Sequence, residues 1–193
     1  LFFPVLQIVP IAVTIAVILG VINLLGTKKS GGLQVALVFG LLSLLLIFIT
    51  SGAFSIQPQH FEGFLAAGFD NIIATAGLVY ISYVGVTKVA SLSEEVKDPE
   101  RNLPRAVFLA LASAILVYGL GTTVVVGLVP PAELRGNLTP VATAAGYAMG
   151  YPGVVLLSLA ALLAFVSVAN AGLLSASRYP LAMSRDHLLP DLF

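Results

Sequence analysis

Five stretches of this sequence carry no charged residue: residues 1–27, 30–61, 71–87, 106–132 and 136–177. A helix needs about 20 apolar residues to cross the hydrocarbon core of a bilayer, and the shortest of these stretches is only slightly below that length. Charged residues make up 9% of the chain, whereas about 25% is usual in soluble domains. The stretches therefore predict an all-α integral membrane protein whose main surroundings are the lipid bilayer.

The fifth stretch is too long for one helix. Its first part contains turn-forming Asn, Pro and Gly residues, so we expect a loop over 136–152 and a helix over about 153–177. The chain starts without Met on an apolar stretch that lacks the basic flank of a signal peptide, so we interpret residues 1–193 as part of a longer membrane domain. The predicted transmembrane spans are about 4–25, 33–53, 70–96, 105–129 and 153–177.

The basic residues lie almost entirely on one side of these alternating spans. The connections 26–32 and 88–105 and the tail 178–193 carry eight of the nine Lys and Arg residues, and only Arg135 lies in the connections 54–69 and 130–152. Lys and Arg are enriched in cytoplasmic loops of membrane proteins. We therefore expect 26–32, 88–105 and 178–193 to be cytoplasmic, in a protein of the cell membrane.

Several function classes are disfavoured by the composition. The formal net charge is zero, so there is no basic face for nucleic acid, and the absence of Cys excludes disulfides and thiolate metal sites. An enzyme working inside the membrane needs charged or His side chains within its helices. The predicted spans hold none in their apolar parts apart from Lys88, and there is no His-Glu-x-x-His motif. We expect neither an enzyme nor a bound cofactor or metal.

The third predicted span is irregular. Asp70 is suited to cap a short helix over 71–81, which is followed by Ser82-Tyr83-Val84-Gly85 and then by the more polar stretch 86–96 with Lys88. Two structures satisfy this pattern. One is a helix broken near Ser82–Gly85 whose second half lines an aqueous cavity, as in transporters. The other is a kinked continuous helix in which Lys88 extends to the cytoplasmic interface.

Residues 80–106 and 175–190 resemble one known family. The first segment contains an aromatic-rich stretch, a Gly, then Glu-Glu, Asp-Pro, an Arg and a Pro near the start of the next helix, which is Pro104. The second contains Arg, Ala-Met, Arg-Asp-His and Leu-Pro, and a third match is Ile22–Gly26 with Gly52. In this order and spacing the motifs resemble helices four to eight of the amino acid–polyamine–organocation permeases.

This resemblance implies a fold and a function. The family has two inverted five-helix repeats (a LeuT-like fold), with helices one and six broken at the substrate site, and the third span here corresponds to the sixth helix. The implied function is secondary active transport of amino acids or related amines by alternating access. Helix one is absent from the 193 residues, so we expect this piece to need the missing helices of the same chain and not to transport alone. A non-transporting membrane sensor or binding protein of the same fold is the alternative.

The resemblance also assigns residues to the substrate site. Ser82, Tyr83 and Gly85 match the unwound segment whose backbone meets the polar end of the substrate. Tyr80 and Ile81 match positions where the family often has a large aromatic gate, although Ile81 is not aromatic.

Gating and coupling are assigned in the same way. Glu94, Glu95 and Arg101 match a cytoplasmic gate, although a solvated loop with weak ion pairs also fits them. Ser167 matches a hydroxyl that lines the cation site of sodium-coupled relatives, although a membrane Ser often bonds its own helix. Gly40 occupies the position of a Lys found in some proton-coupled members. The coupling ion, sodium or proton, stays open.

Overall fold

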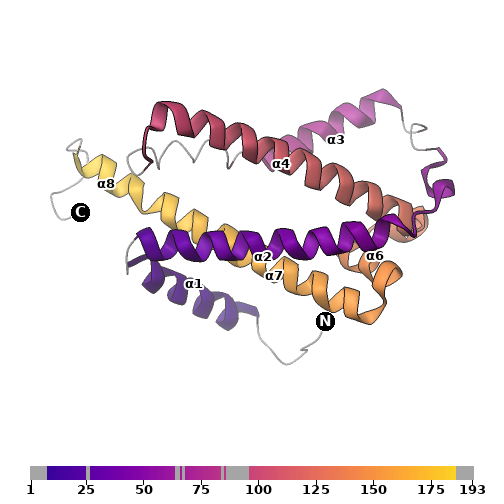
Figure 1. Cartoon of the computed structure of the whole chain (residues 1–193), viewed down its shortest axis with the longest axis horizontal. Coiled ribbons are helices and arrows are strands. Elements are labelled where there is room, and N and C mark those ends of the chain that lie inside the picture. Colours follow the sequence, from indigo (N-terminus) through magenta and orange to yellow (C-terminus); the bar gives the residue numbers. More distant parts are fainter. Residues whose placement is uncertain are drawn as a thin grey trace. The chain divides into compact units, whose positions relative to one another are not determined.

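The computed structural model describes residues 8–24, 27–63, 66, 68–83, 85 and 96–185, and these residues form helices and connections without a strand. The chain divides into two compact units, which are described separately here: unit 1 comprises Leu1–Leu42 and Ala160–Phe193, and unit 2 comprises Ser43–Leu159. The elements in chain order are α1 (Ile8–Leu24), α2 (Thr27–Ala53), η1 (Pro58–Phe61), α3 (Phe69–Ile81), α4 (Pro99–Leu128), α5 (Pro131–Leu134), α6 (Pro140–Met149), α7 (Tyr151–Ala176) and α8 (Arg178–Arg185) (Figure 1).

Three of the described helical stretches are long and apolar enough to cross a membrane. They are Ser30–Ala53, Pro99–Leu128 and Tyr151–Arg185, and two shorter apolar helices cover Val9–Leu24 and Phe69–Ile81. In the described residues the all-helical prediction is therefore confirmed, and the long apolar helices identify an integral membrane protein. The helices α1 and α3 have 17 and 13 residues, fewer than a straight crossing needs.

Polarity is inverted in unit 1 relative to a soluble protein. Large apolar side chains face outward: Phe39 is 74% exposed and Phe165 is 73% exposed. Polar side chains face inward instead, since Ser30 and Asn170 are fully buried. Polar groups in a lipid-embedded protein turn away from the hydrocarbon and bond to one another. This arrangement is what an apolar solvent around the helices requires.

In unit 2, neighbouring segments approach each other closely at two glycines, which have no side chain to separate them. Gly52 of α2 lies against Val124 and Leu128 of α4, and a Cβ atom at Gly52 would be 3.1 Å from Leu128 Cδ1. Gly127 of α4 similarly lies against Ile56, whose Cγ2 would be 2.8 Å from an added Cβ. Small residues allow membrane helices to approach closely enough for van der Waals packing to stabilise them.

The helix α4 begins earlier than its predicted span. Asp98, with φ 48°, adopts the left-handed conformation before the helix, and Pro99 occupies the first turn. Proline is favoured there because the backbone N–H at a helix start has no partner within the helix, so a residue without that N–H loses no hydrogen bond. Pro104, which we expected near the first turn, lies inside the helix. The expectation for Pro104 was therefore wrong, because the sequence offers two prolines and the upstream one begins the helix.

The connection 136–152 is not an irregular loop. It contains α6, and α5 immediately precedes it. Proline occupies the first turn of both helices, and Gly150, with φ 67°, ends α6. The loop expectation was wrong because turn-forming residues such as Pro140 and Gly150 also mark helix ends: Pro140 begins α6 and Gly150 ends it.

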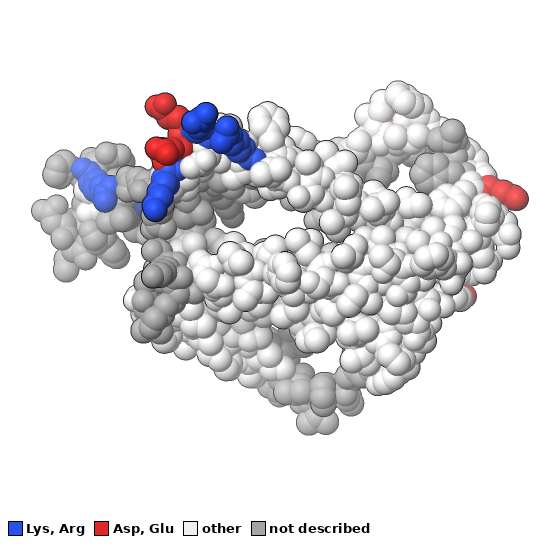
Figure 2. Space-filling view, viewed as in Figure 1, with Lys and Arg blue, Asp and Glu red and all other residues white. Residues whose placement is uncertain are grey.

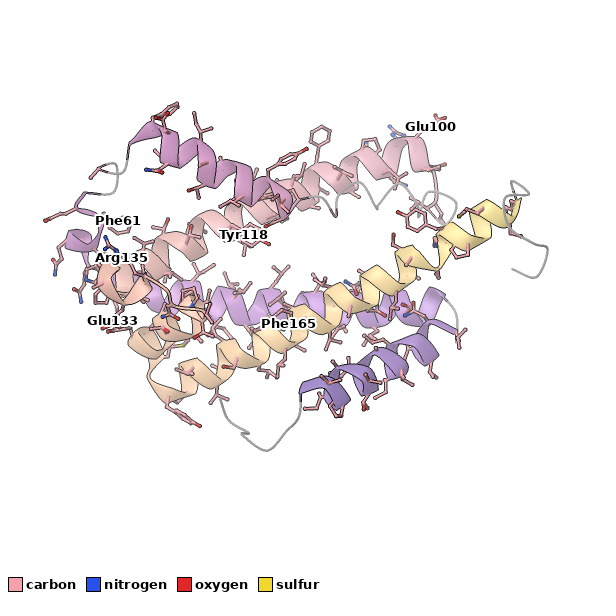
Figure 3. The ribbon with its side chains drawn as sticks, turned by 180° about the vertical axis from the view of Figure 1, so that it is seen from behind. Phe61, Glu100, Tyr118, Glu133, Arg135 and Phe165 are labelled. Carbon is pink, nitrogen blue, oxygen red and sulfur yellow. The ribbon has the colours of Figure 1, made fainter. Side chains whose placement is uncertain are left out.

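The connections 54–63 and 130–139 lie at one end of unit 2. Figure 3 shows Phe61, Glu133 and Arg135 together at that end, and Glu100 at the opposite end of α4. Gly127 O joins the first connection to the end of α4, since it accepts a hydrogen bond from Gln57 N at 2.9 Å. In Figure 2, charged side chains gather over the N-terminal end of α4, and most of the remaining described surface in this view is uncharged.

Candidate functional site

The predicted substrate residues follow one another at the C-terminal end of α3, in unit 2. This helix begins after Gly68, whose φ is 82°, and its first turn contains Asp70. The expectation that Asp70 caps the helix was wrong, because Gly68 is the N-cap and no side chain bonds the free N–H groups. Asp70 is still placed where a carboxylate interacts favourably with the positive end of the helix dipole.

The helix α3 ends at Ile81, and Ser82 is its C-cap. The last turn tightens, since Ser82 N donates to Val79 O at 2.9 Å and Tyr83 N donates to Tyr80 O at 3.0 Å. Such i to i−3 bonds are common at helix ends. Gly85 belongs to the described residues, whereas residue 84 and residues 86–95, including Lys88, Glu94 and Glu95, lie outside them.

The aromatic residues at this end differ in their surroundings. Tyr80 and Ile81 are exposed, at 74% and 65%. Tyr83 is half-buried and packs edge-on against Tyr118 of α4, with ring centroids 6.3 Å apart and an interplanar angle of 83°. Edge-to-face pairs stabilise by about 0.5–1.5 kcal/mol beyond the buried area. This contact connects the end of α3 to α4, and no pattern in the sequence predicts it.

The gate residues are only partly described. Arg101 is exposed in the first turn of α4, and its backbone N–H donates to Asp98 O at 3.1 Å. Its predicted partners Glu94 and Glu95 lie outside the described residues, so the predicted ion pairs stay predictions. Among the residues described, no group of His, Asp and Glu is arranged to hold a metal ion.

Ser167 lies in unit 1, where it belongs to a buried polar cluster that sequence reasoning missed. Gln34 Nε2 donates to Ser167 Oγ at 2.7 Å, and Ser167 is buried. We call this group the polar cluster, and its members from α1, α2 and α7 are Asn23, Ser30, Gln34, Ser167 and Asn170.

A signal for the cluster is present in the sequence. Amides are rare in apolar helices, and here they are spaced so that each helix presents them on one face: Ser30 and Gln34 are four residues apart, and Ser167 and Asn170 are three apart. A search for charged residues does not detect them, because all five members are neutral.

A second polar contact lies at the end of unit 2 that carries α5 and α6. Tyr147 of α6 donates its hydroxyl to both carboxylate oxygens of Glu133 of α5, at 3.1 and 3.0 Å. The hydrogen bond to Glu133 raises the pKa of the Tyr147 phenol above its ordinary value of 10.0, because the negative carboxylate stabilises the protonated hydroxyl. The contact joins the two short helices of this connection.

Comparison with known proteins gives a consistent result. Residues 4–193 match the family described as "Amino acid permease". The chain is 32% identical over 185 residues to a methylthioribose transporter of Bacillus subtilis (strain 168), covering 95% of this chain and 40% of that protein. It is 30% identical over 190 residues to a vacuolar protein named cationic amino acid transporter 4 of Arabidopsis thaliana, covering 95% of this chain and 32% of that protein.

A third relative is a branched-chain amino acid permease of Bacillus subtilis (strain 168). It is 28% identical over 166 residues, which cover 86% of this chain and 36% of that protein. The chain thus spans about two fifths or less of the length of these relatives. All three are transporters by name, which agrees with the expectation drawn from residues 80–106 and 175–190.

Proposed function

Because this chain belongs to the amino acid permease family, we propose that it forms part of a secondary transporter that moves amino acids or related amines across a membrane by alternating access. The observation that carries the proposal is the end of α3 at Ile81, inside the apolar stretch 71–87. A helix that ends at membrane depth must satisfy its backbone groups at a cavity or a ligand.

The chemistry of this end favours a positively charged group. The C-terminal end of a helix carries partial negative charge on its last carbonyl oxygens, which suits the ammonium group of an amino acid or amine. Val79 O already accepts one backbone bond, from Ser82 N, but a carbonyl oxygen has a second lone pair. In the proposal, the backbone of Ser82, Tyr83 and Gly85 meets the polar end of the substrate, and Tyr80 and Ile81 line its path.

The proposed topology has five spans, which belong to a five-plus-five inverted repeat, and the third is broken at Ser82–Gly85. The predicted outer connections 54–69 and 130–152 both have described residues at one end of unit 2 (Figure 3). This shared end supports the proposed sidedness, in which 26–32, 88–105 and 178–193 are cytoplasmic in the cell membrane. The two-fifths coverage of the relatives supports the expectation that the 193 residues alone do not transport.

The proposal assigns coupling to Ser167 and the cytoplasmic gate to Glu94, Glu95 and Arg101. Gln34 occupies one lone pair of the Ser167 hydroxyl, and the second remains able to bind a cation. Uptake measured with sodium and proton gradients imposed separately distinguishes the two ions.

The test is uptake of labelled amino acids and amines by the reconstituted full-length protein. Ser82→Leu should abolish uptake while expression and folding are retained, because the bulky side chain fills the space at the end of α3. The matched control is Ser113→Leu on α4, where an exposed Ser only bonds the Leu109 carbonyl of its own helix, at 2.7 Å. This variant should transport normally.

Normal uptake by Ser82→Leu contradicts the assigned site but leaves the permease function standing. Saturable binding without flux by the wild type contradicts the transport function and identifies the alternative, a membrane sensor.

A further inference from the structure

The polar cluster of unit 1 connects three helices through side chains that are separate from the end of α3. We propose that this cluster is a hydrogen-bonded clamp that fixes α1, α2 and α7 against one another within the membrane, with Asn170 as its central residue. The inference concerns the cohesion of three helices and does not depend on the proposed transport function.

Asn170 uses its full hydrogen-bonding capacity. Its Nδ2 donates to Gln34 Oε1 at 3.1 Å and to the Ser30 carbonyl at 3.4 Å, and its Oδ1 accepts from Asn23 Nδ2 at 3.1 Å and from Ser30 Oγ at 3.3 Å. A side-chain amide has two donor hydrogens and two acceptor lone pairs. Asn170 is fully buried, so no contact with solvent could replace these bonds.

The orientation of this amide is determined by its neighbours. The Ser30 carbonyl can only accept a hydrogen bond, so the group facing it must be the Asn170 Nδ2. Turning the amide over would bring Oδ1 against that carbonyl and Nδ2 against the Asn23 amide nitrogen. The rest of the network therefore allows only one orientation.

The other bonds extend the network to both sides of Asn170. Ser30 Oγ shares its single hydrogen between Asn170 Oδ1 and Asn23 Oδ1, the latter at 2.9 Å, and Asn23 Nδ2 donates to the Leu19 carbonyl of α1 at 2.8 Å. The Gln34 amide donates to Ser167 Oγ at 2.7 Å. An unbroken chain of bonds thus runs from the last turn of α1, through the first turns of α2, to α7.

The clamp specifies how the three helices are rotated relative to one another, which contacts between apolar faces cannot do. Lipid tails are as apolar as Leu or Val side chains, so burial of apolar surface does not select one rotation of a membrane helix over another. The cluster side chains meet only when α2 presents positions 30 and 34, and α7 presents positions 167 and 170, on facing sides. A rotated or shifted helix would leave amides unpaired in an apolar medium.

The chemistry around Asn170, at the centre of the cluster, fits a closed network better than an ion or proton site. All five side chains are neutral and do not titrate in the physiological range, so none can store a proton. The amide N–H groups of Asn23, Gln34 and Asn170 point to oxygen atoms of other members or of nearby backbone. A cation at the centre would face these donor groups as well as the oxygens.

The test is thermal unfolding of the full-length protein in lipid nanodiscs. Asn170→Leu retains the size but removes four hydrogen bonds, and we expect the apparent Tm to fall by about 3 °C or more. The matched control is Thr14→Val on α1, because the Thr14 hydroxyl is exposed and bonds only the Pro10 carbonyl of its own helix, at 2.8 Å. Thr14→Val should leave the Tm unchanged.

A milder set of variants keeps the proposal testable if Asn170→Leu does not fold. Gln34→Leu and Ser167→Ala remove the same interhelical bond, so the double variant should lower the Tm by less than the sum of the single variants. Additive effects, or a stable Asn170→Leu protein, overturn the clamp.

Salt dependence separates the clamp from an ion site. The clamp predicts the same Asn170→Leu deficit in sodium chloride and in choline chloride. A deficit found only with sodium would show that the amides bind the ion and would overturn the clamp. Because uptake is not the readout, failure of the clamp and failure of the proposed transport function are distinguishable.

Discussion

The contact of Gly52 with α4 gives a prediction whose magnitude follows from the geometry. In Gly52→Ala the added Cβ would overlap Val124 Cγ1 and lie 3.1 Å from Leu128 Cδ1. Val124 and Leu128 are both buried, at 3% exposure each. A β-branched residue in a helix has one strongly preferred χ1, so Val124 cannot turn its methyl group away at low cost. The helices must therefore separate or distort to accept the methyl group.

Two opposing terms set the size of the effect. Over-packing a well-packed interior costs about 1–3 kcal/mol. Replacing Gly by Ala inside a helix contributes about 1 kcal/mol in the other direction. Gly119→Ala on α4 measures the second term alone, because nothing lies within 4 Å of an added Cβ there. The difference between the free energies of unfolding of the two variants is therefore the over-packing cost, about 1–3 kcal/mol.

The assay is denaturant unfolding of the purified full-length protein, followed by a conformational probe. We expect Gly52→Ala to be less stable than Gly119→Ala, and Val124→Ala to restore stability selectively in the Gly52→Ala background, because it removes the overlapping methyl group. Equal stability of Gly52→Ala and Gly119→Ala, or an effect of Val124→Ala that is identical in both backgrounds, would refute the close approach of α2 and α4.

Two further predictions concern the connection between α4 and α7. Because the pKa of Tyr147 is raised, its bond to Glu133 contributes its full stability below the unfolded pKa of about 10 and loses it as the pH rises through the folded pKa. A tyrosinate absorbance titration should therefore lose one late-titrating group in Tyr147→Phe. The difference in unfolding free energy between the wild type and Tyr147→Phe should stay constant with pH below about 9. Gly153→Ala should destabilise by about 1–3 kcal/mol in denaturant unfolding, since the added Cβ would overlap the Ala145 carbonyl and approach Met149 Cβ at 2.8 Å, and backbone cannot move aside as a side chain can. A Gly153→Ala protein as stable as the wild type would exclude this contact.

The sequence predicts those features that depend on charge and local patterning. Long runs without charge predict long apolar helices, because a charge inside the hydrocarbon is costly whatever the tertiary structure. The resemblance of residues 80–106 and 175–190 to permeases is likewise confirmed by the family match over residues 4–193. Both signals are local in the chain and do not require knowledge of which helices touch.

Features that depend on contacts between distant segments could not be predicted. Asn23 and Asn170 lie 147 positions apart, and although an amide stands out in an apolar helix, its position does not show which distant residue it contacts. The pairing of Tyr83 with Tyr118 is hidden for the same reason. Turn-forming residues are ambiguous in a different way, because a proline can begin a helix, as Pro140 does, or can break one.

The composition around the polar cluster gives a prediction about the coupling ion, which the sequence left open between sodium and proton. The stretches 9–24, 30–42 and 160–177, which form the apolar helices of unit 1, contain no acidic, basic, His, Tyr or Cys residue. Gly40, the position of a Lys in some proton-coupled relatives, lies against Leu163, whose Cδ1 would be 3.4 Å from an added Cβ. No side chain in these stretches can therefore carry a proton near physiological pH. If coupling resides at Ser167, its free lone pair binds a metal cation, and a sodium gradient rather than a proton gradient drives the uptake that Ser167→Ala weakens.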